Sequence, residues 1–275
     1  MDRIEKIKKY VKSPYGVGVA FLIFTFSVYL YFHQSGLNAL IEQAASNYLQ
    51  GEQAVSKYDR EQAFNAALEQ YLSMEKKYDP TYGTGKLYFN IASTLFQLEE
   101  YPQAILYNYK TLKLNPSDQK ALENLEIIWN RIGLPPVVEE RNAFDLIFLE
   151  GTLSLPRKIQ LFSLFFLITC GVLSWAFWKP SSLNKVVAPI FGTVACYFLS
   201  SVFYAQFIVP VEGVILSASP LYRDAGTQYA KVVEEPVVSG SKVKIFDITP
   251  NGEWAKIMTP NGNLGYVLFE KMRVI

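Results

Sequence analysis

Three long stretches without a charged residue constrain this chain most, because a polypeptide hides such stretches only in a membrane or in a large core. Residues 13–41, 159–178 and 186–211 contain no Asp, Glu, Lys or Arg. The apolar centre of the first stretch, residues 15–32, approaches the ~20 residues that a helix needs to cross the hydrocarbon layer. The sequence therefore predicts three membrane-spanning helices.

Basic residues near these stretches predict how the chain crosses the membrane. Five of them precede the first stretch, between residues 3 and 12, and Lys179 and Lys185 flank the short loop between the other two. The positive-inside rule places both regions in the cytoplasm, so residues 33–158 and the tail from 212 lie on the other side. Arg157 and Lys158 weigh against this orientation but are outnumbered.

The first stretch has a second interpretation, a cleaved signal peptide. Signal peptides have apolar regions of about 7 to 15 residues and end in a small-residue cleavage site. This stretch is longer, and the Gln-Ser-Gly sequence at residues 34–36 is a poor site, which favours a retained anchor. Under both interpretations the downstream residues are exported.

Charge and rare residues exclude several classes of function. The formal net charge is +1, which is too small to attract nucleic acid electrostatically. The single histidine, His33, and both cysteines, Cys170 and Cys196, lie in or beside the uncharged stretches. The exported regions thus contain no ligands for a Cys/His metal site and no His-based nucleophile. The predicted spans lack Asp, Glu, Lys and Arg, which argues against a transporter or channel. The two cysteines are interpreted as packing residues, and the alternative is that they face each other across the hairpin.

Two further patterns come close to catalytic motifs. Residues 83–86, Gly-Thr-Gly-Lys, resemble the end of a phosphate loop but lack the Gly required at 80 and the Ser or Thr required at 87. An enzyme that uses carboxylates alone, such as a glycosidase, would need acids like those at 99–100 and 139–140, but these lie in polar sequence typical of a solvated surface. We therefore expect no catalytic, cofactor-binding or metal-binding residue.

Residues 38–133 show helical periodicity and form what we call the helical array. Its clearest unit, residues 85–118, resembles the tetratricopeptide repeat, whose signature Tyr88, Ala92, Ala104 and Pro116 match. An upstream unit matches more loosely, through Tyr58, Phe64, Ala67, Tyr71 and Pro80. A final helix with Leu125, Ile128 and Ile132 is expected to cap the array.

The first helix of each repeat normally lines a concave face that binds a peptide or a partner helix. By helical position this face should carry Phe89, Asn90, Ser93, Phe96 and Gln97, continued by Lys120, Glu123, Asn124 and Ile127. Asn90, Lys120 and Asn124 partly resemble repeats that grip a C-terminal carboxylate, but Glu52 stands where such a clamp needs a basic residue. Protein binding through this face is therefore the prediction.

Residues 134–158 are predicted to be a linker, with an apolar patch at 144–149 that lies on the membrane surface or on the array. Residues 212–275, here called the β module, show short β-rich runs. Val243 and Ile245 alternate with Lys242 and Lys244, which is the pattern of a half-buried strand with its lysines toward solvent.

Two repeated turn sequences mark the second half of the β module. Thr-Pro-Asn-Gly occurs at 249–252 and at 259–262, which predicts two tight turns around one strand. Trp254 and Tyr266 are expected on the outer face as an aromatic platform, with Ile257 inside.

The β module resembles the bacterial Src-homology-3-like domain, in which a Gly-Trp-Val-like triplet follows a Trp-x-x-Val strand. Here the triplet is Gly265-Tyr266-Val267, and Tyr266 replaces the usual Trp. Relatives of that domain often bind peptide or peptidoglycan.

The order of parts resembles the BatE-like proteins of bacterial aerotolerance operons. It predicts a multidomain membrane protein with a basic tail and anchor (1–37), an all-α tetratricopeptide-type array (38–133), the linker (134–158), a transmembrane hairpin (159–211) and a small all-β Src-homology-3-like barrel (212–275).

The resemblance implies a non-catalytic scaffold in the bacterial inner membrane, multi-pass, with array and β module on the periplasmic side. Its implied partners are membrane proteins with von Willebrand factor A domains and a MoxR-type ATPase, in a complex linked to stress tolerance. The alternative function is envelope anchoring, in which the β module binds peptidoglycan.

Overall fold

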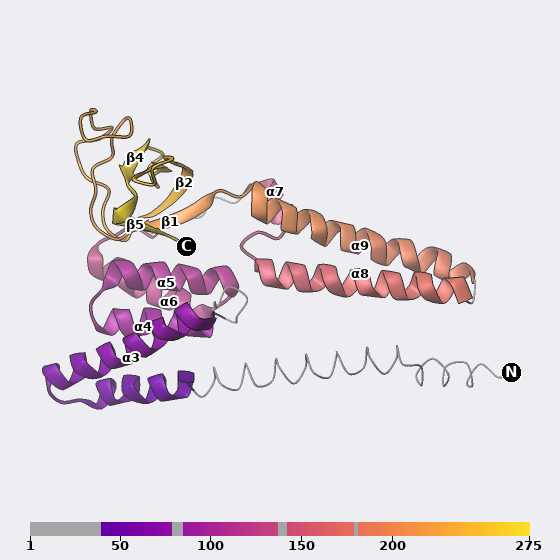
Figure 1. Cartoon of the computed structure of the whole chain (residues 1–275), viewed down its shortest axis with the longest axis horizontal. Coiled ribbons are helices and arrows are strands. Elements are labelled where there is room, and N and C mark those ends of the chain that lie inside the picture. Colours follow the sequence, from indigo (N-terminus) through magenta and orange to yellow (C-terminus); the bar gives the residue numbers. More distant parts are fainter. Residues whose placement is uncertain (1–39, 79–84, 137–141, 179–180) are drawn as a thin grey trace. The chain divides into compact units, whose positions relative to one another are not determined.

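The structure is a computed structural model that describes residues 40–78, 85–136, 142–178 and 181–275 (Figure 1). The chain divides into two compact units, Met1–Tyr78 and Asp79–Ile275. The fold is mostly helical, with a small antiparallel sheet at the C-terminal end and two apolar helices long enough to cross a membrane. The first predicted span, residues 15–32, lies outside the described residues.

In the first unit, residues 40–53 form a helix that packs against α3 (Lys57–Tyr78). Gly51 permits the close approach, since a Cβ there would lie 2.7 Å from the Phe64 ring. The same ring packs against Tyr48, with centroids 5.2 Å apart. These contacts make the two segments a helical pair.

The motif residues of this unit are only partly inside. Phe64, Ala67 and Tyr71 are buried, as their spacing predicts. Tyr58, which belongs to the loose upstream match, stands in the first turn of α3 and is 70% exposed. Pro80 lies outside the described residues.

The second unit begins with α4 (Lys86–Gln97), α5 (Tyr101–Leu114) and α6 (Gln119–Ile132). Gly85 precedes α4 with φ +81°, and a Cβ there would lie 3.1 Å from the Thr111 carbonyl oxygen, so glycine is required. Tyr88, Ala92 and Ala104 are buried between the helices, as the repeat signature predicts.

Helix α6 has clear start and stop signals. Asp118 caps it by accepting a hydrogen bond from the Ala121 backbone nitrogen at 3.2 Å, and Gly133 ends it with φ +70°. Leu125 and Ile128 are buried, as expected of a capping helix.

Helices α8 (Leu155–Trp178) and α9 (Ser182–Phe207) lie side by side as a hairpin (Figure 1). Phe165 stacks on Phe191 and Phe198, with centroids 6.0 and 5.8 Å apart. At 1.5 Å per residue their 24 and 26 residues span about 36 and 39 Å, enough for ~30 Å of hydrocarbon.

The hairpin departs from the predicted ranges 159–178 and 186–211. Helix α8 begins four residues earlier and includes Lys158, while α9 ends at Phe207 because Val211 pairs with Ile245 in the sheet. Cys170 and Cys196 are free and exposed, so their interpretation as packing residues was wrong. The short helix α7 (Ala143–Ile147) precedes the hairpin.

The β module contains β1 (Val211–Ile215), β2 (Lys242–Ile248), β3 (Trp254–Met258), β4 (Leu264–Leu268) and β5 (Met272–Val274). The short 3-10 helix η2 (Phe269–Lys271) leads into β5. All pairings are antiparallel, in the order β4-β3-β2-β1-β5. Its core contains Ile215, Leu221, Val243, Ile257, Val267 and Met272.

Both predicted turns are present. The Gly252 nitrogen donates to the Thr249 carbonyl at 2.7 Å, and the Gly262 nitrogen donates to that of Thr259 at 2.9 Å. Both glycines have positive φ, +72° and +80°. At Gly265 in β4 a Cβ would lie 2.6 Å from the Tyr222 carbonyl oxygen, so glycine is needed where the segment around Tyr222 lies against β4.

Candidate interaction surfaces

The predicted partner-binding residues of α4 lie on one side of that helix. Its opposite side carries the buried residues, among them Tyr88, Ile91 and Leu95. None of the five predicted residues is fully buried or widely exposed; they are half-buried: Phe89, Asn90, Ser93, Phe96 and Gln97. A partner could contact only the outer edges of these side chains.

On α6 the predicted residues differ in access to solvent. Lys120 and Glu123 are exposed, Ile127 is 49% exposed, and Asn124 is half-buried. Among the described residues, no hydrogen bond joins Asn90, Asn124 and Lys120 to one another. The described contacts therefore do not hold these three side chains together as a carboxylate clamp.

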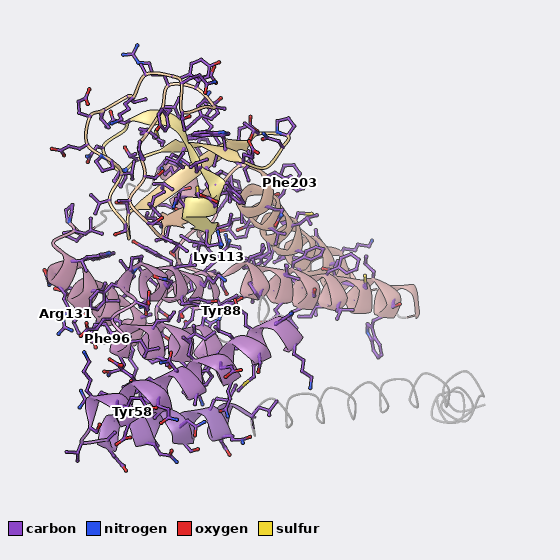
Figure 2. All side chains as sticks on the ribbon, turned by 60° about the vertical axis from the view of Figure 1, so that its left-hand side comes forward. Tyr58, Tyr88, Phe96, Lys113, Arg131 and Phe203 are labelled. Carbon is purple, nitrogen blue, oxygen red and sulfur yellow. The ribbon has the colours of Figure 1, made fainter. Side chains whose placement is uncertain are left out.

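Phe96 belongs to a small cluster with two residues that the sequence analysis missed. The Arg131 guanidinium lies 5.4 Å from the Phe96 ring centroid and donates to the Tyr101 hydroxyl at 3.0 Å. This hydrogen bond raises the pKa of Arg131. Figure 2 shows Phe96 and Arg131 side by side. Only the packing of α6 against α4 and α5 brings these residues together, so no local pattern in the sequence signals the cluster.

A second surface of the array is occupied by the β module. The Lys242 ammonium lies 4.7 Å from the Tyr109 ring centroid in α5 and pairs with Glu212 at 2.9 Å. The Lys242 side chain is 7% exposed. Its expected place on the solvent side of β2 was wrong, because α5 covers that part of the sheet.

Two further contacts hold the sheet to α5. The Lys113 ammonium donates to the Ile275 carbonyl oxygen at 2.7 Å. A Cβ at Gly240 would lie 2.9 Å from Ile105 Cδ1 in α5 and 3.0 Å from Leu134 Cδ1, so the turn before β2 approaches α5 and the end of α6 closely. Array and β module therefore share an interface of apolar and charged groups.

The electrostatics of Lys113 reflect this interface. Burial of its ammonium end lowers the pKa of Lys113, although the nearby carboxylates of Glu212 and Glu150 oppose the shift. Lys110 and Lys242 lower it further. Charges from α5, β1, β2 and the turn before α8 thus converge on one place.

On the far side of the β module, Trp254 is covered. It lies on the face opposite Ile257, as predicted, but is 7% exposed, because the Tyr222 ring meets it edge-on with centroids 5.6 Å apart. The exposed platform was therefore wrong for Trp254. Tyr266 is half-buried, with the Lys256 ammonium 5.8 Å from its ring centroid.

A hollow of about 580 Å³ lies beside Trp254. Residues 225–228 form one wall, and residues 249–254 form the other. Thr227, Gln228 and Asn251 supply hydroxyl and amide groups, and Glu253 supplies a carboxylate. Such a wall can hydrogen-bond a polar ligand beside an indole edge.

Within the described part of the chain, no group of three or more His, Cys, Asp and Glu residues could hold a metal ion. The described contacts at the array and β-module surfaces are cation–π pairs, ion pairs and apolar packing.

Comparison with known proteins finds no protein-family model that matches this chain and no similar curated protein. The class that the structure itself defines is a mostly helical protein with a small antiparallel sheet and two helices able to cross a membrane.

Proposed function

We propose that this chain is a non-catalytic, membrane-anchored scaffold that binds protein partners through its helical array. The observation that supports the membrane topology in this proposal is the interface between array and β module, formed by Lys242, Tyr109, Lys113 and Gly240. The two parts are far apart in sequence, and the apolar hairpin lies between them along the chain. They nevertheless pack against each other.

This interface supports the predicted topology. If α8 and α9 both cross the membrane, the chain returns to the side on which it started. Array and β module can then meet only on that shared side. The basic loop between the helices, with Lys185, marks the opposite side as cytoplasmic, which makes the shared side periplasmic.

The proposed setting is the bacterial inner membrane, in a complex linked to aerotolerance or stress tolerance. The array is proposed to be a tetratricopeptide-type array and the β module a Src-homology-3-like barrel, on the motif residues and the order of parts. The proposed partners are membrane proteins with von Willebrand factor A domains and a MoxR-type ATPase, as the resemblance to the BatE-like family implies.

Affinity purification of the intact protein in mild detergent tests the binding role. Phe89→Ser combined with Phe96→Ser should abolish co-purification of the partners, because it removes both aromatic rings from the predicted face. A matched control is Phe246→Ser, which removes a 54% exposed ring from the β module and should leave binding intact. A partner that binds all variants equally would contradict the assignment of this face.

A second variant guards against loss of folding, since both array rings are half-buried. Lys120→Glu reverses an exposed charge on α6, and exposed substitutions usually change stability by less than about 0.5 kcal/mol. It should weaken co-purification without moving the melting temperature. Lys231→Glu, an exposed reversal in the β module, is its control.

The hollow beside Trp254 favours a second candidate function, binding of peptidoglycan by the β module. Sugar and peptide groups of the wall offer hydroxyls and amides that Gln228 and Asn251 could meet. Sedimentation of the full chain with purified wall material should then fall for Gln228→Ala and stay unchanged for Glu234→Ala, an exposed residue outside the hollow. Equal sedimentation of both variants would speak against this function.

A further inference from the structure

We propose that residues 143–153, here called the elbow, dip into the membrane leaflet on the side of the array and present Phe144, Leu146 and Ile147 to lipid acyl chains. This inference rests on the proposed membrane anchoring. The elbow consists of α7 and the turn that leads into α8. The three apolar side chains are 61%, 60% and 55% exposed, an unusual share for a five-residue helix in water.

The depth of the elbow follows from its hydrogen bonds to α9. The Tyr197 hydroxyl donates to the Ile147 carbonyl at 2.6 Å, and the Ser201 hydroxyl donates to the Phe148 carbonyl at 2.5 Å. At 1.5 Å per residue, Tyr197 and Ser201 lie about 15 and 9 Å before the end of α9 at Phe207. A ~30 Å hydrocarbon layer centred on α9 would include both positions.

Non-helical backbone at this depth requires partners for its polar groups, because lipid offers none. The carbonyls of Ile147 and Phe148 stand at the end of α7, where a helix leaves its last carbonyls unpaired. Tyr197 and Ser201 supply the missing donors from the neighbouring helix. The two hydroxyls therefore do what water would do for an elbow outside the membrane.

The elbow contains two charged groups, Asp145 and Glu150, and each has a partner on a neighbouring helix. Asp145 accepts a hydrogen bond from the Tyr204 hydroxyl at 2.8 Å, nearer the end of α9. Glu150 pairs with Lys158 at 2.6 Å, and the Lys158 side chain is 1% exposed. An ion pair such as Glu150–Lys158 makes a charge close to hydrocarbon tolerable, and the Tyr204 hydroxyl gives Asp145 a hydrogen-bond donor there. The elbow is thus tied to α9 by its first half and to α8 by its second.

An apolar hollow of about 380 Å³ continues the same surface onto α9. It is lined by Phe148, Leu199, Ser200, Phe203, Tyr204 and Ile208. Phe203 projects from α9 and is 57% exposed (Figure 2). The exposed apolar surface of the elbow is therefore continuous with the surface that α9 turns to lipid, so acyl chains are the occupant that fits both.

Fluorescence quenching in phosphatidylcholine vesicles tests the depth of the elbow. Single cysteines are introduced by Ile147→Cys, Leu173→Cys or Glu235→Cys in full-length protein lacking Cys170 and Cys196, and each is labelled with an environment-sensitive fluorophore. Nitroxide-labelled acyl chains should quench the labels at 147 and 173, and aqueous iodide should quench only the label at 235.

Each other result is decisive. Iodide quenching at 147 together with lipid quenching at 173 would overturn the elbow and leave the membrane hairpin intact. Iodide quenching at both positions would contradict the membrane anchoring itself. Protection of position 147 from both quenchers would show that protein covers the elbow, and this too would overturn the inference.

The hydroxyl donors give a second test. Tyr197→Phe combined with Ser201→Ala removes both donors to the elbow, so iodide quenching of the label at 147 should rise. Ser200→Ala is the matched control, because the Ser200 hydroxyl donates within its own helix, to the Cys196 carbonyl. Equal quenching in the double variant and the control would refute the role of the two hydroxyls.

Discussion

Lys242 offers the sharpest probe of the interface between array and β module. Its ammonium lies 4.7 Å from the Tyr109 ring centroid, and its side chain is 7% exposed. Cation–π pairs contribute about 0.5 to 1 kcal/mol at exposed sites and about 2 kcal/mol when desolvated. The burial of Lys242 places this pair toward the upper end, at about 1 to 2 kcal/mol.

A double-mutant cycle isolates that coupling. Lys242→Met and Tyr109→Leu each keep an apolar side chain of similar volume and remove the charge or the ring. Lys242→Met alone also breaks the ion pair with Glu212 and should lower the free energy of opening by about 2 kcal/mol. This is less than the ~3 to 5 kcal/mol for breaking a fully buried pair, because the Glu212 side chain is 34% exposed and regains contact with water. The cycle subtracts this contribution, which does not involve Tyr109.

The assay is hydrogen exchange of β2 amides in detergent-solubilised protein, read as the free energy of opening. The cycle should give a coupling of about 1 to 2 kcal/mol. The matched control pairs Tyr109→Leu with Lys244→Met, since Lys244 is an exposed lysine on the same strand, and these two should be additive. Additivity within ~0.5 kcal/mol for Lys242 as well would refute the packing of the sheet on α5.

Two further predictions concern the β module, and a third concerns Lys113 in α5. Ile257→Ala should lower the free energy of unfolding by about 2 to 5 kcal/mol, because Ile257 is fully buried in the sheet core. Trp254→Ala should lower it by about 3 to 5 kcal/mol, because the Trp254 ring is covered. Denaturant unfolding of the variants measures both, and a fully stable Trp254→Ala would restore the exposed platform. The lowered pKa of Lys113 means that the unfolded chain binds more protons between the folded pKa and 10.5, so stability should rise with pH across that window. Lys113→Met should flatten this rise in a series of melting temperatures, and an unchanged slope would contradict the desolvation of the Lys113 ammonium.

Local patterns predicted much of the fold. The repeat signature at Ala92 and Ala104 placed two small residues at the contact between α4 and α5, and both are fully buried. The repeated Thr-Pro-Asn-Gly sequences predicted both turns around β3, because Pro and Gly fix the backbone locally. Such features depend on a few neighbouring residues, so a single sequence carries them.

The predictions that failed depend on packing between distant segments. Period-two alternation assigns Lys242 to solvent, and only the arrival of α5 on that face buries it. The same alternation predicted that Trp254 is exposed, but Tyr222 covers it from a loop that has no strand periodicity. Arg131 joined Phe96 for the same reason, since nothing in the spacing of the two residues relates them.

The central claim, that array and β module share the side of the membrane opposite the basic loop, is tested most directly by thiol labelling in intact cells. Glu126→Cys, Glu235→Cys and Ser182→Cys each place one exposed cysteine in protein lacking Cys170 and Cys196. An impermeant thiol reagent should label positions 126 and 235 and leave position 182 unlabelled until the membrane is opened. Labelling of position 182 alone, or labelling of only one of the other two, would contradict the account.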